Sequence, residues 1–260
     1  MFCLAALLGA TSALADARED CNKSGDVAIA GCTELIKSNP NDAMAYNNRG
    51  IEYAAKQDYD HAIADYTKAI ELNPKFASAY AGRGIAYDDK GEYDRAIADY
   101  DKAIELKPNN PVAYNNRGNA YSSKREYDRA IADYDKAIEL KPNFPNVYAA
   151  RGVAYDDKRE YDRAIADYSK AIELNPKFAL AYNDRGAAYA NQEDYNSALP
   201  DYNKAIELDP KYATAYHNRG KAYEALARRD EAIADFRRAL AENPDYQQSK
   251  EALERLNASP

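Results

Sequence analysis

Large aliphatic side chains are scarce in this sequence of 260 residues. Leu, Ile, Val and Phe together make up 39 of them, about 15%, below the roughly 20% under which a highly charged chain is expected to be disordered. Disorder is nevertheless not predicted, because the net charge is only −8 and the chain contains 24 Tyr, whose rings bury area as other aromatics do. We therefore expect a folded chain whose core depends on tyrosine.

Long apolar runs and clustered positive charge are also missing. No segment reaches the roughly 18 apolar residues of a membrane span, so no membrane-spanning helix is expected. The chain has 35 Lys and Arg against 43 Asp and Glu, whereas nucleic-acid binding needs a clustered basic surface. We therefore expect no nucleic-acid partner.

Catalytic and metal-binding patterns are absent as well. The sequence has no G-x-S-x-G, Walker or H-E-x-x-H motif, and its two histidines, His61 and His217, have no clustered second ligand, so no metal is expected. The pairs Asp88-Asp89 and Asp156-Asp157 lack the spacing of a calcium loop, and adjacent side chains on a helix diverge by about 100°. We expect neither an enzyme nor a cofactor.

The first fifteen residues differ in composition from the rest of the chain. They are apolar and uncharged, and Ala13-Leu14-Ala15, just before the first charge at Asp16, is typical of a signal-peptide cleavage site. We expect residues 1–15 to be a short signal peptide without a basic n-region, and the mature chain to be periplasmic or secreted. A buried N-terminal helix in a cytoplasmic protein is the alternative.

Cysteine is rare, and Cys3 lies within the predicted leader. Cys21 and Cys32 remain, and an even number of cysteines in an exported chain favours a disulfide. We predict a disulfide between these two residues, which flank a turn at 23–25. Two free, buried thiols in a cytosolic protein are the alternative.

Repetition, in contrast, is abundant, with a period of 34 residues. Each period contains an Arg-Gly pair, an alanine twelve residues after the glycine, and a proline twelve residues further on. The glycines are Gly50, Gly84, Gly118, Gly152, Gly186 and Gly220, and the first alanine and proline are Ala62 and Pro74. Two helical patterns fit each period, for example 77–90 and 93–106, and a proline, which lacks an amide hydrogen, ends the second. Since glycine inside a helix costs about 1 kcal/mol relative to alanine, we expect the two helices to cross closely at Gly84 and Ala96.

This pattern resembles the tetratricopeptide repeat, in which aromatic, Leu-Gly, Tyr, Ala, aromatic and Pro positions recur at fixed spacing. The unit 77–110 supplies those positions with Tyr80, Gly84, Tyr87, Ala96, Tyr100 and Pro108. The resemblance implies an all-α, right-handed solenoid of helical hairpins. We expect six repeats over 43–246, a degenerate N-terminal capping repeat at 16–42 and a C-terminal capping helix at 247–260.

Arginine replaces the leucine of that pattern in all six units, and each arginine is followed sixteen residues later by an aspartate. Arg83 and Asp99 lie eight residues on either side of Gly91, and an antiparallel hairpin brings such positions together. The guanidinium fork suits a carboxylate. We therefore predict a structural ladder of Arg–Asp pairs.

One position breaks the regularity of the second helices. Pro200 stands about five residues into its helix, where the other units have alanine. A proline there removes a backbone hydrogen bond. We therefore expect the fifth unit to be the least stable.

The resemblance also implies a function. In tetratricopeptide proteins the first helix of each unit lines an inner groove that binds peptides or protein segments, and a structural or self-associating array is the alternative. The groove residues expected on this basis are Asn47, Asn48, Ile51, Ser78, Asp88, Asp89, Asn115, Asn116, Asn119, Asn146, Asp156, Asp157, Asn183, Asp184, His217, Asn218 and Lys221. Lys221 is the only cation in this set, against five Asp, so we expect a partner protein or peptide with a basic or polar extended segment.

Overall fold

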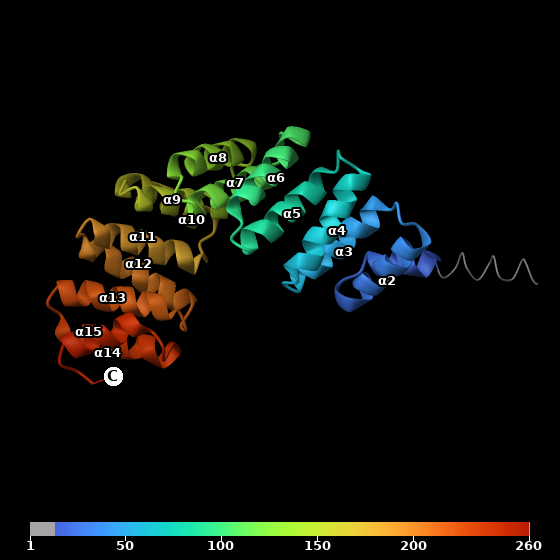
Figure 1. The fold of residues 1–260 in the computed structure, drawn as a ribbon. Coiled ribbons are helices and arrows are strands. Elements are labelled where there is room, and N and C mark those ends of the chain that lie inside the picture. The colour runs from blue at the N-terminus through green and yellow to red at the C-terminus, as the bar shows by residue number, and fades with distance from the viewer. Residues whose placement is uncertain (1–13, 260) are drawn as a thin grey trace, which may run out of the picture. The chain divides into compact units, whose positions relative to one another are not determined.

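The computed structural model describes residues 14–259, and every regular element in that range is an α-helix. Residues 14–21 are helical, and the helices that follow are α2 Gly25–Ser38, α3 Ala43–Ala55, α4 Tyr59–Leu72, α5 Ala77–Asp89, α6 Tyr93–Leu106, α7 Pro111–Ser123, α8 Tyr127–Leu140, α9 Pro145–Asp157, α10 Tyr161–Leu174, α11 Ala179–Asn191, α12 Tyr195–Leu208, α13 Ala213–Ala225, α14 Arg229–Glu242 and α15 Gln247–Arg255 (Figure 1). The predicted leader 1–15 lies outside the described residues except for its last two.

The 34-residue period of the sequence corresponds to one hairpin of two helices. The helices predicted at 77–90 and 93–106 are α5 and α6, and the predicted helix ends differ from the observed ones by one residue at most. The all-α architecture of helical hairpins is therefore confirmed. Pro200 lies inside α12, which runs through it with the same length as its counterparts.

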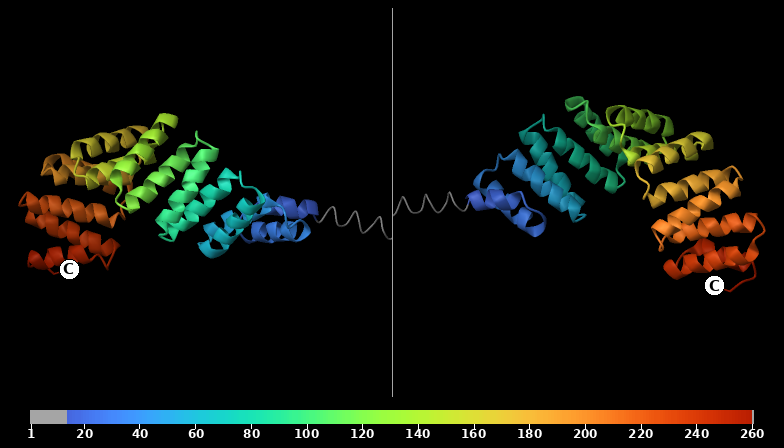
Figure 2. Two further views of the ribbon diagram at one scale, coloured as in Figure 1. Left: turned by 45° about the horizontal axis from the view of Figure 1, so that its top comes forward. Right: turned by 180° about the vertical axis from the view of Figure 1, so that it is seen from behind.

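The chain forms two compact units, which divide between Arg129 and Ala130. Within each unit, successive hairpins lie side by side (Figure 2). In the first unit α3 contacts α5 and α5 contacts α7, and in the second α9, α11 and α13 contact one another in the same order. No comparable contact joins α4 with α6, or α10 with α12, among the described residues. The first helices therefore line the inner side of each stack.

The core of a hairpin is an aromatic ring packed against a glycine. Tyr100 of α6 is 1% exposed and Ala96 is fully buried, and a Cβ atom added to Gly84 of α5 would lie 2.7 Å from the Tyr100 ring. Any side chain at this crossing would displace the ring, which explains the mid-helix glycine. The same contact is made by Gly50 with Tyr66, Gly152 with Tyr168, Gly186 with Tyr202 and Gly220 with Phe236.

Five of the predicted Arg–Asp pairs are present, and their arginines reach further than expected. Arg83 donates from Nε and Nη2 to the two oxygens of Asp99 at 2.7 and 2.8 Å, and from Nη1 to Thr67 Oγ1 of the preceding hairpin at 3.0 Å. The bidentate pair recurs as Arg49–Asp65, Arg151–Asp167, Arg185–Asp201 and Arg219–Asp235. The second contact recurs from Arg49 to Thr33, Arg117 to Asp101, Arg151 to Asp135, Arg185 to Ser169 and Arg219 to Asn203. Arg49, Arg83, Arg151, Arg185 and Arg219 make both contacts, and each thus joins two neighbouring second helices.

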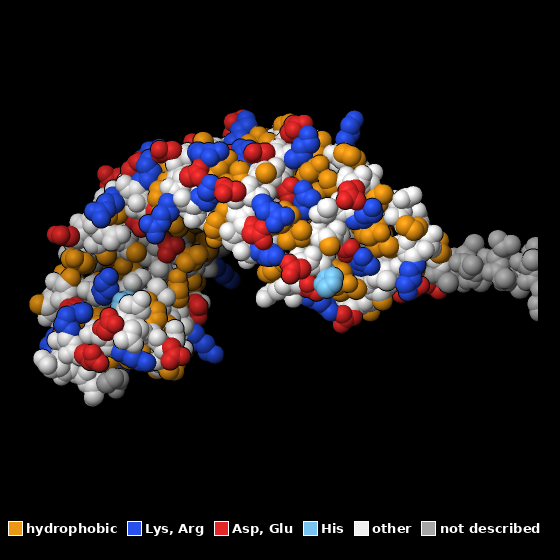
Figure 3. Space-filling view, viewed as in Figure 1, with side chains coloured by type: hydrophobic (Ala, Val, Ile, Leu, Met, Phe, Trp, Pro, Cys, Tyr) orange, Lys and Arg blue, Asp and Glu red, His pale blue; other side chains and the backbone are white. Residues whose placement is uncertain are grey.

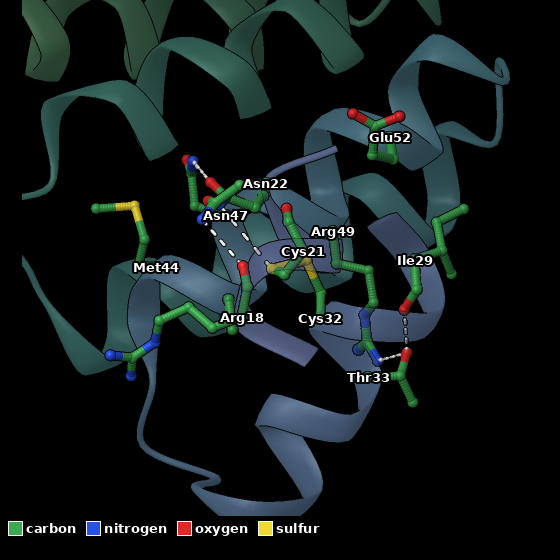
Figure 4. Close-up of a disulfide and its surroundings, with 12 residues drawn as sticks. Arg18, Cys21, Asn22, Ile29, Cys32, Thr33, Met44, Asn47, Arg49 and Glu52 are labelled. Carbon is green, nitrogen blue, oxygen red and sulfur yellow. Dashed lines mark hydrogen bonds between the residues drawn. A yellow bond between two sulfur atoms is a disulfide. The ribbon is translucent and has the colours of Figure 1, made fainter. Parts of the chain in front are cut away.

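The N-terminal end of the array is closed by a half-repeat. A disulfide joins Cys21 and Cys32 (Figure 4), and a Cβ at Gly31 would lie 2.6 Å from the backbone nitrogen of Cys21, so the helical residues 14–21 and α2 cross closely. Thr33 of α2 accepts a hydrogen bond from Arg49, as Figure 4 shows. The half-repeat therefore attaches to α3 through the same arginine contact that joins full repeats.

Candidate functional site

The inner face of the first helices exposes large hydrophobic side chains at two recurring positions seven residues apart. Because seven residues are about two helical turns, both positions lie on one face of the helix. The exposed residues are Met44 and Ile51 of α3, Ile85 of α5, Val112 of α7, Val153 of α9 and Leu180 of α11, with exposures between 40% and 56%. Of these, sequence reasoning named only Ile51. The others are found by comparing the two positions across the repeats.

In the first unit an unusual carboxylate accompanies these residues. Asp88, near the end of α5, is half-buried, and its Oδ1 atom is buried without a hydrogen-bond partner among the described residues. Burial, reinforced by the adjacent charge of Asp89, raises the pKa of Asp88 to about 6. Asp89 itself is exposed. The pair carries negative charge that no nearby cation in the described structure neutralises by direct contact.

In the second unit the carboxylates join a chain of amides. Asp156 of α9 accepts a hydrogen bond from Asn191 Nδ2 at 3.3 Å, and burial raises its pKa. Asp184 of α11 accepts from Asn183 Nδ2 at 3.0 Å, and burial raises its pKa to about 6. Asn218 of α13 in turn donates to Asn183 Oδ1 at 3.0 Å. Asp157 is exposed. The inner face of this unit is therefore lined by desolvated acids held by amide side chains.

Three expected groove residues turn out to be packing residues. Asn47 and Asn183 are 4% exposed and His217 is 7% exposed. The His217 ring lies between the Phe236 and Tyr246 rings and its Nδ1 is 2.9 Å from Ser249 Oγ of α15. These three side chains are therefore buried against neighbouring helices and are not exposed on the inner surface.

The other expected groove residues lie on or near the inner surface. Ser78, Asn146 and Lys221 are exposed, whereas Asn48, Asn115, Asn116, Asn119 and Asn218 are half-buried. Asn48 donates to Asn22 Oδ1 at 3.5 Å and Asn115 to Asn116 Oδ1 at 3.2 Å. Lys221 has no hydrogen-bond or ion-pair partner among the described residues. Within each unit the structure therefore brings amides, acids and exposed aliphatic side chains onto one face.

A pocket of about 580 Å³ opens in the inner face of the second unit. It is formed by α11 and α13, with side chains from α12 and α15 at its floor and rim. Its lining residues are Ala187, Ala190, Asn191, Glu193, Tyr195, Tyr202, Asn218, Lys221, Ala222, Glu224, Ala225 and Arg255. Arg255 forms two hydrogen bonds with Glu224, at 3.0 and 2.8 Å.

The face of the molecule drawn in Figure 3 mixes both charge signs with hydrophobic side chains. Over residues 14–259 no three His, Cys, Asp or Glu side chains come together as metal ligands. No helix in the same range is long and apolar enough to cross a membrane. The inner face is therefore the surface on which repeated exposed aliphatic side chains and desolvated acids coincide.

Family models match most of the chain. The model described as tetratricopeptide repeat matches residues 43–76, 111–144, 145–178, 179–212 and 213–246. Two further models, described as TPR repeat and tetratricopeptide repeat, match residues 86–124 and 65–98. No curated protein gives a significant match.

Solved structures resemble the fold closely. The chain is 27% identical to YrrB, described as a TPR protein with an unusual peptide-binding site, with a TM-score of 0.60 over 73% of this chain and 97% of that one. It is 30% identical to MamA, with a TM-score of 0.58 over 64% of this chain and 96% of that one. A structure of the APC/C hetero-tetramer Cut9-Hcn1 shares 22% identity and a TM-score of 0.73, over 86% of this chain but only 44% of that one. The last likeness concerns the fold alone.

Proposed function

Because this chain belongs to the tetratricopeptide repeat family, and such repeats serve as protein-interaction scaffolds, we propose that it captures a peptide or protein segment on the inner face of its first helices. The observation that carries this proposal is the set of exposed aliphatic side chains on the first helices of each unit, such as Ile51 and Ile85 in the first unit and Val153 in the second, which no other part of their own unit covers. Exposed apolar side chains gathered on one face are typical of binding surfaces. The peptide-binding site in the description of YrrB supports the same interpretation.

The charges of this face suggest the chemistry of the partner. Asp88 and Asp184 have pKa values raised to about 6 by burial, so near pH 7 each holds a carboxylate that is poorly solvated. A Lys or Arg side chain of the partner would compensate that charge, and the acidic face would attract such a segment from solution. We therefore propose a partner segment that is extended, contains at least one Lys or Arg, and places apolar side chains against the exposed aliphatic side chains.

The proposal is tested by two sets of four substitutions. The first replaces the inner-face acids Asp88, Asp89, Asp156 and Asp157 by Asn. The matched control replaces the exposed acids Asp60, Asp94, Asp162 and Asp230, at the starts of second helices, by Asn. The partner is whatever protein is retained by residues 16–260 used as bait.

The inner-face set is expected to weaken binding of the retained partner by about ten-fold at low salt and to flatten its salt dependence, because those charges lie at the contact. The control set should change the affinity less than two-fold. Equal effects of the two sets, or binding that strengthens with salt, would contradict the placement of the site.

We also propose that the chain is exported. The apolar segment 1–15 and the disulfide between Cys21 and Cys32 support this, because disulfides persist in oxidising compartments. Fractionation of cells that express the full chain, with mass spectrometry of its N-terminus, tests the proposal. Recovery of the intact N-terminus in the cytoplasm, with Cys21 and Cys32 both as free thiols, would rule it out.

A further inference from the structure

The pocket in the second unit exists because repeat five has small side chains where other repeats have large ones. Ala187 of α11 occupies the position of Ile51, Ile85 and Val153. Ala190 occupies that of Asp88 and Asp156, where the first and third repeats also have the small residues Ala54 and Ser122. With these side chains reduced to methyl groups, the ring of Tyr202 beneath becomes part of the pocket lining. The hollow is thus specific to this repeat, whereas the exposed aliphatic side chains are common to several.

The floor of the pocket combines apolar walls with one unused polar group. Ala187, Ala190 and Ala222 supply methyl groups, and Tyr202 is 2% exposed. The Tyr202 hydroxyl makes no hydrogen bond among the described residues, and burial raises its pKa, so it stays protonated. It can donate to or accept from a polar atom that enters the pocket.

The lining of the pocket carries two cations, Lys221 and Arg255, and two carboxylates, Glu193 and Glu224. Lys221 is exposed without a partner, and Arg255 is held at the rim by its two bonds to Glu224. A cation at a pocket edge attracts the face of an aromatic ring, and Lys221 is the cation of this lining that no carboxylate contacts in the described structure. The amide of Asn191 lies on the same rim and adds a polar contact.

From these features we propose that the pocket is the anchor site for an aromatic side chain of the partner, with tyrosine preferred because its ring suits the alanine walls and the Lys221 ammonium while its hydroxyl suits that of Tyr202. Aromatic side chains combine a large apolar area with a polar end. This inference rests on the proposed function and adds to it the residue class that sets specificity in the second unit.

Short peptides of the form acetyl-Gly-Ser-X-Ser-Gly-amide test the proposal, with X being Tyr, Phe, Leu, Lys or Glu. Binding is followed by chemical-shift changes of the whole mature protein on titration to millimolar peptide. The Tyr peptide is expected to bind most tightly, the Phe peptide next, and the other three at least five-fold more weakly. Shift changes should centre on the backbone of residues 187–191 and 218–225.

Two variants separate the pocket from the rest of the groove. Ala187→Ile installs the residue found naturally at the same position in the first two repeats, so it should fold while filling the pocket and abolishing the preference for Tyr. Lys221→Gln should lower the affinity for the Tyr peptide by about two- to five-fold, as expected for the loss of a cation–π contact. The matched control is Lys204→Gln, which removes an exposed cation paired with Glu207 on α12. It should leave the affinity for every peptide unchanged.

The proposal is overturned if the Leu, Lys or Glu peptide binds more tightly than the Tyr peptide, or if Ala187→Ile keeps the preference for the Tyr peptide. It is also overturned if no peptide binds at millimolar concentration. The proposed function still holds in that case if the four inner-face Asp-to-Asn substitutions weaken binding of the retained partner. If neither the preference for the Tyr peptide nor the effect of the inner-face substitutions is observed, the inner face is not the binding site.

Discussion

Arg83 binds Asp99 through two parallel hydrogen bonds and still has a third nitrogen free to reach Thr67 in the preceding hairpin. One guanidinium therefore closes its own hairpin and fixes the position of that hairpin on the previous one. Both side chains of the pair are largely buried, with exposures of 17% and 8%. Only the planar, five-donor guanidinium satisfies both contacts at once.

This arrangement predicts that arginine cannot be exchanged for lysine. Arg83→Lys removes the fork and the contact with Thr67, and leaves an oxygen of the buried Asp99 without a donor, so the free energy of unfolding should fall by about 1–3 kcal/mol. Urea denaturation followed by circular dichroism measures the change. Arg125→Lys, in an exposed turn, is the control and should leave the midpoint unchanged. An unchanged midpoint for Arg83→Lys would show that the ladder contributes no stability.

The hairpin turns offer a second prediction. The residue after each first-helix cap has a positive φ, and it is a glycine only at Gly91; the others are Gln57, Arg125, Arg159, Glu193 and Ala227. Left-handed backbone strains any residue with a Cβ by roughly 1–2 kcal/mol, and alanine has no side-chain hydrogen bond to offset the strain. Ala227→Gly should therefore raise the free energy of unfolding by about 0.5–1 kcal/mol.

The control for that change is Ala234→Gly, at an exposed position inside α14. Glycine in a helix interior should lower stability by about 0.5–1 kcal/mol, so the two alanine-to-glycine variants should move the melting temperature in opposite directions. A decrease for Ala227→Gly would mean that the turn is not strained in solution.

Pro200 leads to the third prediction. It lies on the exposed side of α12, where the equivalent residues in the other repeats, such as Ala166, are also exposed, so its replacement leaves no cavity. Pro200→Ala restores an amide hydrogen that can bond to the carbonyl four residues earlier, and should stabilise α12 by up to about 3 kcal/mol. Amide exchange over 196–202 should be faster than over 162–168 in the parent chain, and the two rates should converge in the variant. Equal amide-exchange rates for the two segments in the parent chain would show that the fifth repeat is not the least stable.

The repeat period was enough to predict the hairpins and the Arg–Asp pairs, because both follow from distances along the chain. Arg83 and Asp99 are equally far from Gly91, so any antiparallel hairpin brings them together. The contact from Arg83 to Thr67 was missed because it depends on how one hairpin is positioned on the next, which the sequence of a single unit does not specify.

The inner face was harder to predict for the same reason. His217 shares its repeat position with Asn47 and was expected in the groove. It is instead covered by α15, whose Ser249 Oγ lies 2.9 Å from His217 Nδ1. The exposed aliphatic residues Ile85 and Val153 were overlooked because hydrophobic residues at helical spacing are usually part of a core. Whether such a residue is buried depends on the neighbouring repeat and not on its own helix.

The buried histidine provides the last prediction. Burial, aided by the positive charges of Lys221 and Arg255 and opposed by Glu224, lowers the pKa of His217 from 6.5 to about 4. Between these values the unfolded chain binds a proton that the folded chain does not, so the contribution of His217 to stability is complete above pH 6.5 and is lost as the pH falls toward 4. The loss should amount to about 1–3 kcal/mol.

Asp88 and Asp184 titrate in the same range with the opposite sign, since their folded pKa values are raised, so the measurement must be a difference between two chains. His217→Asn installs the residue that Asn183 supplies at the same position in the preceding repeat. Because only the opposing contribution of the aspartates then remains, the urea midpoint at pH 4 relative to that at pH 6.5 should be higher in the variant than in the parent chain. In the parent chain, amide exchange of α15 should accelerate over this interval before that of α9, because protonation of His217 acts on the helix that covers it. Identical pH profiles for the two chains would mean that His217 is already protonated in the folded state at pH 6, and that its contact with Ser249 does not hold α15 in place.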